Sequence, residues 1–413
     1  MNGVLDVVEA LHFVQNYISY FGGDPTKVTI AGESSGAMNS CILGFTPIAS
    51  SLFHQMILES GSCIGPWIGP SFSAESALNA SSKFANAVLN RLNRLNGATV
   101  SDDSTTVKIK KPTSNGRTKT KIIAAPPPPP PPPTTTPKTP TTLSRLRELS
   151  VNDIVESSEF GTLNYGIDNY IMTQRPQFNS VISFRGTLLL GGNNGDTTCR
   201  GVGAVPVTPS CLTSLKKTLL VYFGTMDDVN MVLAPYLSNS SSNTTVNASQ
   251  ILSKNAAADI FYAMSRDAGV TCPTLRLAGR KSHGSAVYLF QFGYNATSVD
   301  APVWHGGELN AVWQNYTAAT ATRDFKKAQE LSKVVGEYWT SFVRTGHPTS
   351  TTSTIEWPTF SKDNEEFTYF DGKGEVEATP FSYGKDGHCE SWNAYIERGT
   401  QEAMNVDAFG YLC

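Results

Sequence analysis

The chain has 413 residues, and its 32 basic and 35 acidic side chains give a formal net charge of −3. Nucleic-acid binders usually carry a clear basic excess, so this balance argues against that class of protein. Hydrophobic residues make up 40% of the chain, which permits a sizeable core and argues against general disorder. No apolar run reaches about 18 residues, so we expect no membrane-spanning helix.

The hydrophobic pattern predicts strands that alternate with helices along most of the chain. Apolar residues recur at helical spacing over residues 6–20, and Gly22-Gly23-Asp24-Pro25 ends that helix. The other predicted elements are strands at 28–31, 55–58, 187–190 and 285–292, and helices at 37–43 and 328–343. This alternation indicates a mostly parallel central sheet with helices on both faces, in a single domain over residues 1–413.

Residues 101–142 interrupt this pattern. Basic side chains precede eight consecutive prolines, Pro126–Pro133, and Thr/Pro repeats follow them. Because proline fixes φ and donates no hydrogen bond, this segment is expected to be extended, disordered and solvated. We interpret it as a low-complexity insertion, and the alternative is a docking site for a proline-recognising partner.

Six N-x-[ST] sequons and seven scattered cysteines favour the secretory pathway, where disulfides persist. The sequons are at Asn79, Asn239, Asn243, Asn247, Asn295 and Asn315. Their chance occurrence in a Ser/Thr-rich chain is the alternative. The first residues lack the basic start and apolar run of a signal peptide, which conflicts with secretion. No C-x-x-C pair, Walker A pattern or complete dinucleotide motif occurs, so we expect no metal and no cofactor.

Gly32-Glu33-Ser34-Ser35-Gly36 fits the G-x-S-x-G pattern of a serine nucleophile, with a predicted strand before it and a predicted helix after it. The glycines are expected because the turn is too tight for a side chain on either flank. Ser34 then projects from the carboxyl edge of the sheet, and the helix N-terminus behind it favours developing negative charge. Ser34 is therefore the candidate nucleophile, and a serine-rich loop is the alternative.

Ordered motifs along the chain resemble the type-B carboxylesterase and cholinesterase family. The matching segments are 3–6, 10–11, 21–25, 28–37, 59–62, 66–67, 270–273, 277–280, 305–309, 338–339, 344–348 and 389–393. They cover nearly the whole chain except residues 101–142. The resemblance implies an α/β-hydrolase fold and a serine esterase activity.

A serine hydroxyl needs a base, and the base needs a carboxylate to orient it. The run His305-Gly306-Gly307-Glu308 is similar to the catalytic-histidine motif of the family, so His305 is the expected base. Asp196 and Asp228 compete as the acid. We favour Asp196, because it coincides with the acid position of the family without a gap and its separation from His305 is similar. The family usually has Glu there, so the shorter Asp is expected to lengthen the hydrogen bond to the imidazole.

The resemblance also implies supporting roles. Glu33 tunes the field near His305, Ser60 hydrogen-bonds within the triad, and Glu308 supports it. Trp67 belongs to the acyl pocket, and Cys272 pairs with Cys389. The pairing of the remaining cysteines stays open, and at least one of the seven is unpaired within the chain; the five are Cys41, Cys63, Cys199, Cys211 and Cys413.

The family begins well before Met1. The upstream part would supply a signal peptide, several strands and a His-Gly-Gly-type loop with two oxyanion-hole donors. Only the backbone N–H of Ser35 remains here as a donor, and losing one donor costs about 10²–10³ in kcat. We therefore expect an N-terminally truncated chain whose strand at 28–31 has an unpaired edge.

The predicted function is hydrolysis of a small-molecule carboxylic ester by a secreted enzyme. The ester acylates Ser34, His305 moves the proton, and water releases the acid. The alternative is a catalytically impaired, esterase-like binding or adhesion module, or a truncated fragment that lacks the oxyanion loop. The triad pattern favours the enzyme, and the missing loop favours the alternative.

Overall fold

The computed structural model describes seven stretches of the chain and a few isolated residues. The stretches are 2–65, 182–196, 212–238, 254–281, 284–361, 363–380 and 388–398. The chain divides into one compact unit of Met1–Ala77 with Asn164–Cys413 and a second of Leu78–Leu163. The helices and strands named below all belong to the first unit. The predicted insertion at 101–142 and its proline run lie outside the described residues.

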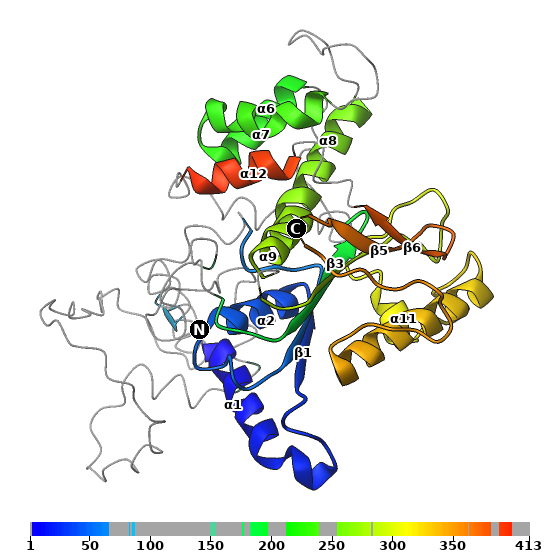
Figure 1. Ribbon diagram of the computed structural model, residues 1–413. Helices are drawn as coiled ribbons and strands as arrows, with labels where there is room; N and C mark the ends of the chain where they lie inside the picture. Colours follow the sequence, from blue (N-terminus) through cyan, green and yellow to red (C-terminus); the bar gives the residue numbers. More distant parts are fainter. Residues whose placement is uncertain are drawn as a thin grey trace, which may run out of the picture. The chain divides into compact units, whose positions relative to one another are not determined.

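A six-stranded sheet forms the centre of the first unit (Figure 1). Its strands are β1 (Thr29–Glu33), β2 (Gln55–Glu59), β3 (Thr187–Asn193), β4 (Val287–Phe292), β5 (Glu366–Phe370) and β6 (Val376–Pro380), in that spatial order. The first five run parallel, and β6 pairs antiparallel with β5. The mostly parallel sheet predicted from the sequence is therefore confirmed.

Helices connect and cover these strands. They are α1 (Asn2–Tyr17), α2 (Ser35–Phe45), α6 (Leu212–Phe223), α7 (Met226–Ser238), α8 (Lys254–Arg266), α9 (Cys272–Lys281), α10 (Leu309–Val312), α11 (Phe325–Thr345) and α12 (His388–Glu397). A 3₁₀ turn at Ile18–Phe21 (η1) extends α1, and a π-helical turn at Asp267–Thr271 (η3) joins α8 to α9. Glycines in the left-handed region end η1 and α11, at Gly22 and Gly346.

Alternate residues of the inner strands face two separate cores. Met56, Leu58, Leu188, Leu190, Val287 and Leu289 pack with α1, α2 and α9 on one face. Ile57, Leu189, Tyr288, Phe290 and Phe292 pack with α11 on the other. Side chains of successive strand residues point to opposite faces, so strands covered on both sides read as continuous apolar runs. Figure 1 shows α2 and α11 on opposite sides of the sheet.

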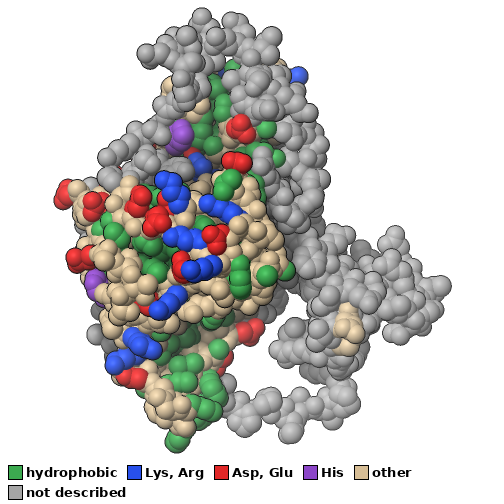
Figure 2. All heavy atoms as spheres, turned by 90° about the vertical axis from the view of Figure 1, so that its right-hand side faces the viewer, with side chains coloured by type: hydrophobic (Ala, Val, Ile, Leu, Met, Phe, Trp, Pro, Cys, Tyr) green, Lys and Arg blue, Asp and Glu red, His purple; other side chains and the backbone are tan. Residues whose placement is uncertain are grey.

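The outer face of α11 is solvated. Figure 2 shows this side of the molecule, with Lys and Arg side chains interspersed among Asp and Glu. Lys326 pairs with Glu330 one turn further along the helix, and Lys327 pairs with Glu375. This division into a buried and a charged face confirms the amphipathic helix predicted at 328–343, which begins three residues earlier and ends two later.

A third core lies among helices alone. Apolar side chains of α6, α7, α8 and α12 pack together, with Phe223, Trp392 and Tyr395 in mutual ring contact. A disulfide between Cys272 and Cys389 joins the start of α9 to α12. No helix in the described stretches is both long and apolar enough to cross a membrane.

Strand β1 lies at the edge of the described sheet. It pairs with β2, and the described residues contribute no second partner. Every residue of β2 is buried, whereas no residue of β1 is, and Ala31 at its centre is exposed. Large apolar side chains are also exposed on α1 and η1 nearby in sequence; they are Phe13, Tyr17, Tyr20 and Phe21. Such an edge is a site for pairing with another strand.

Candidate active site

Ser34 occupies a sharp turn between β1 and α2. Its backbone has φ 56° and ψ −120°, a strained conformation for a residue with a side chain. A Cβ on Gly32 would come within 2.2 Å of the Gly36 carbonyl carbon, so only glycine fits there. A Cβ on Gly36 would meet nothing within 4 Å. The prediction that both flanks exclude a side chain is therefore right for Gly32 and wrong for Gly36.

The structure brings Ser34, His305 and Asp196 together. The Oγ atom of Ser34 lies 2.7 Å from Nε2 of His305, and Nδ1 of His305 lies 2.6 Å from Oδ1 of Asp196. A carboxylate accepts hydrogen bonds only, so Nδ1 donates to Asp196 and Nε2 is left to accept from the Ser34 hydroxyl. The three side chains thus form one hydrogen-bonded series, from residues far apart in the sequence.

Asp196 reaches the histidine from a tight turn after β3. Its Oδ2 accepts the backbone N–H of Asn193 at 2.9 Å. Two hydrogen bonds also join this turn to the segment that leads to His305. The backbone N–H of Val303 donates to Asn194 Oδ1 at 2.8 Å, and the backbone N–H of Gly195 donates to the Val303 carbonyl. The expected lengthening of the imidazole bond is wrong: the turn carries the shorter Asp side chain close enough for a 2.6 Å contact.

Asp228, the competing acid, has another role in the structure. It lies in the first turn of α7, where its Oδ2 accepts from the Thr225 hydroxyl at 2.6 Å. Its own backbone N–H donates to Thr225 Oγ, and Arg398 lies 3.5 Å from its Oδ1. These contacts belong to the start of a helix, where acidic side chains are favourable.

Glu33 and Glu308 act on His305 through their charges, and Glu59 lies close to both of these glutamates. Glu33 Oε1 lies 3.4 Å from His305 Nε2. Glu308 is buried, accepts from the Asn193 amide and accepts from the Ser60 hydroxyl at 3.4 Å. Glu59 at the end of β2 is also buried. Burial, together with the charges of Asp196 and Glu59, raises the pKa of Glu308 to about 8. Burial likewise raises the pKa of Glu33, although His305 opposes the increase.

The carboxylates dominate the titration of His305. Burial by itself lowers the pKa of the imidazole, but the hydrogen bond and charge of Asp196, with the charges of Glu33 and Glu308, outweigh it and raise the pKa to about 9. A raised pKa makes the imidazole a stronger base, and only its neutral form can accept a proton.

Two disulfides are present among the described residues. Cys272–Cys389 is the pair implied by the family resemblance. Cys41–Cys63 joins α2, the helix behind Ser34, to the loop after β2. The sequence left this second pairing open because the two cysteines become neighbours only when the parallel crossover places α2 against β2. Several candidate residues lie outside the described residues: Trp67, Cys199, Cys211, Cys413, Asn79, Asn239, Asn243 and Asn247.

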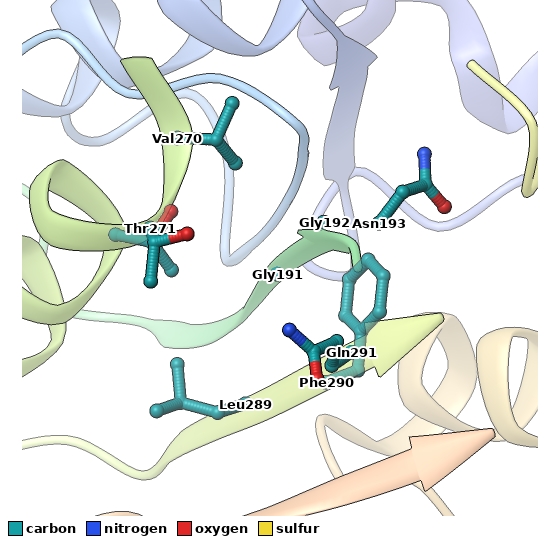
Figure 3. A pocket seen from close by; sticks show the side chains of 9 residues that line it. Gly191, Gly192, Asn193, Val270, Thr271, Leu289, Phe290 and Gln291 are labelled. Carbon is teal, nitrogen blue, oxygen red and sulfur yellow. The ribbon is translucent and has the colours of Figure 1, made fainter. Parts of the chain in front are cut away.

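A small cavity lies behind the turn that carries Asp196. Its volume is about 20 Å³, and residues of β3, β4 and the η3–α9 segment line it, among them Gly192, Thr271 and Gln291 (Figure 3). A single water needs roughly 10–15 Å³ of such volume. The cavity can therefore hold a water molecule but not an ester.

A serine after a parallel strand, an aspartate after a later strand and a histidine further on, in that chain order, define an α/β-hydrolase. A family model described as the carboxylesterase family matches residues 2–111 and 147–386. The chain belongs to the carboxylesterase family.

Curated relatives agree with this family. The chain is 24% identical over 377 residues to a cocaine esterase from Homo sapiens, covering 88% of this chain and 57% of that protein. It is 24% identical over 387 residues to liver carboxylesterase 1F from Rattus norvegicus, covering 88% and 60%. A shorter stretch of 63 residues is 51% identical to human carboxylesterase 5A, covering 15% and 11%. The chain thus spans less than two thirds of the length of these relatives.

Proposed function

We propose that this chain is a serine carboxylic-ester hydrolase that acts on small-molecule esters through an acyl-enzyme intermediate. The observation that carries the proposal is the unbroken hydrogen-bonded series from Ser34 through His305 to Asp196. The carboxylesterase family supports the reaction class. A binding module has no need of a strained serine held against an imidazole, so these contacts favour an enzyme over a binding module.

The proposed reaction begins when the ester carbonyl carbon is attacked by Ser34 Oγ, whose proton passes to His305 Nε2. Asp196 accepts the hydrogen bond from the Nδ1–H group of His305 and stabilises the imidazolium. The tetrahedral intermediate then collapses, the carbon–oxygen bond to the alcohol breaks, and the alcohol leaves with the proton from Nε2. Water repeats the sequence on the acyl-enzyme, returning the carboxylic acid and the free Ser34 hydroxyl.

The negative oxygen of the intermediate needs hydrogen-bond donors. We assign the backbone N–H of Ser35 to this role, because it follows the nucleophile at the N-terminus of α2, where the helix dipole favours an anion. Each such donor contributes about 10²–10³ to kcat, so the number of donors sets the rate that this chain reaches.

We also propose that residues 1–413 form one α/β-hydrolase domain with an insertion at 101–142, and that the protein is secreted. Two disulfides support an oxidising compartment. Of the two sequons in the described residues, Asn315 is exposed and therefore open to a glycan. The Asn295 amide already donates to the Pro302 carbonyl at 2.9 Å, which makes it the less suitable acceptor.

The proposal is tested by hydrolysis of p-nitrophenyl butyrate at several pH values. We expect turnover that rises with pH toward about 9, because His305 must lose its proton to act as the base. Ser34→Ala should abolish it, and Ser238→Ala, which removes an exposed hydroxyl on α7, should not. Turnover that survives in folded Ser34→Ala would overturn the proposal, as would none from the folded wild type.

A further inference from the structure

Glu59 lies directly beside the nucleophile strand. Glu33 and Glu59 are partners in the parallel register of β1 and β2, so their side chains leave the same face of the sheet from strands about 4.8 Å apart. The Glu59 carbonyl also accepts the backbone N–H of Ser34 at 2.9 Å. Glu59 is therefore hydrogen-bonded to the nucleophile turn through its backbone and is the register partner of Glu33, whose carboxyl lies beside His305.

The Glu59 carboxyl has one satisfied and one unsatisfied oxygen. Its Oε1 accepts the indole N–H of Trp339, on α11, at 3.0 Å. Its Oε2 is fully buried and has no hydrogen-bond partner among the described residues. Glu33 Oε1 is buried and lacks a hydrogen bond in the same way. Glu33 Oε1 still has the imidazole 3.4 Å away, whereas the buried Oε2 of Glu59 has no partner among the described residues and is costly unless the Glu59 carboxyl carries a proton.

The charges around Glu59 favour that proton. Burial is the main cause that raises its pKa to about 7, and the charge of Glu33 adds to it, while the Trp339 bond opposes it. The titratable groups that face it among the described residues are Glu33 from β1 and Glu308 from the segment before α10. No lysine or arginine of the described stretches is among the groups that shift the pKa of Glu59.

We propose that Glu59 is a positioning residue for the hydrolase: as a neutral acid it leaves Glu33 as the nearer anion facing His305, and when ionised it adds a second negative charge beside Glu33. This inference rests on the proposed esterase function. Glu59 touches no substrate and acts only through Glu33 and His305. A charge added there stabilises the imidazolium, so the base loses its proton at a higher pH.

The first test is the pH dependence of kcat/KM for Glu59→Gln. Glutamine keeps the acceptor for Trp339 and mimics the neutral acid. We expect its ascending limb to shift to lower pH by about 0.5–1 unit, because one negative charge near Glu33 and His305 is removed. Glu330→Gln removes an exposed carboxylate on α11 and should leave the profile unchanged. A Glu59→Gln profile that superimposes on the wild type would overturn the proposal.

A second measurement does not depend on turnover. The pKa of His305 can be followed by NMR of histidine-labelled protein, with the resonance assigned by His305→Gln. Glu59→Gln should lower that pKa, and Trp339→Phe should lower it less, because losing the indole donor only keeps Glu59 neutral to a higher pH. If no ester is hydrolysed but the pKa shifts, the proposed function fails and the role of Glu59 stands. An unchanged pKa in both folded variants rejects that role.

Discussion

Strands β1 and β2 lie side by side, run parallel and end at the same edge of the sheet. Each ends in a glutamate, and each is followed by a serine with positive φ, 56° at Ser34 and 52° at Ser60. Each serine N–H extends the ladder to the next strand, from Ser34 to Glu59 and from Ser60 to Gly191. The two strands therefore end in the same local backbone conformation and the same hydrogen-bond pattern.

The surroundings of the two strand ends differ. β2 is buried along its whole length, and Ser60 bonds to the buried Glu308. β1 is only partly covered, and Ser34 bonds to His305, whose side chain keeps 22% of its surface exposed. A nucleophile has to meet substrate, so the proposed function assigns the reactive serine to the accessible strand and a supporting role to the buried Ser60. Ser34 and Ser60 differ in the burial of their strands and in their hydrogen-bond partners, not in the conformation of the turn.

The largest expected effect is the loss of activity when each of the two serines is replaced. We expect Ser34→Ala to remove turnover and Ser60→Ala to reduce kcat by less than about tenfold, since it deletes one hydrogen bond to Glu308. Initial rates on p-nitrophenyl butyrate measure both, with melting temperatures matched by circular dichroism. Equal losses in two folded variants would break the distinction.

The next largest effect is expected at the two aspartates, Asp196 after β3 and Asp228 in α7. Asp196→Asn should lower kcat by about 10³–10⁴-fold, because the amide holds the imidazole in the wrong tautomer. Asp228→Asn should leave kcat close to wild type and cost about 0.5–2 kcal/mol of stability at the start of α7. Steady-state kinetics and urea unfolding separate these outcomes, and similar kcat losses would contradict the assignment of the acid.

A matched pair in the centre of the two strands tests their burial. Ala31 and Ile57 are register partners, one exposed and the other 2% exposed. Ile57→Ala should lower the free energy of unfolding by about 2–5 kcal/mol. Ala31→Lys should change it by less than about 0.5 kcal/mol and reduce self-association, because a charge on an edge strand discourages pairing. A large loss in Ala31→Lys would show that something covers β1.

The smallest effect concerns the two glutamates and pH. The folded state binds the Glu59 proton more tightly than the unfolded chain, so stability falls as pH rises from about 4.5 to about 7. Glu59→Gln should remove this fall, worth on the order of 2–3 kcal/mol at pH 8 relative to pH 5. Glu33→Gln should change the pH dependence of the unfolding free energy less than Glu59→Gln does, because Glu33 is only half-buried. Urea unfolding at both pH values measures the difference.

Much of this arrangement follows from the sequence. The apolar runs at 55–58, 187–190 and 285–292 predict β2, β3 and β4 because strands covered on both faces are apolar throughout. The order of Ser34, Asp196 and His305 likewise predicts which side chains meet. In the structure, Ser34 Oγ and Asp196 Oδ1 each lie at hydrogen-bond distance from a ring nitrogen of His305.

Other features depend on the folded neighbours. The hairpin of β5 and β6 is absent from the sequence prediction, although residues 366–369 and 376–379 alternate polar and apolar side chains, because runs of four residues are short. Gly36 resembles Gly32 in the motif, yet only the fold shows that a Cβ fits at Gly36. Glu59 offers no signal as a supporting residue, because its importance comes from the register with Glu33 and from Trp339, 280 residues away along the chain.

The most direct test of the account is covalent labelling of the folded wild-type protein with a fluorophosphonate, followed by peptide mass spectrometry. A serine activated by His305 should displace fluoride and take up one phosphonyl group. We expect a single adduct on Ser34, none on Ser60, and no adduct in His305→Gln. An adduct on Ser60 or Ser35 instead, or no adduct on the folded protein, would contradict the claim that β1 carries the reactive serine.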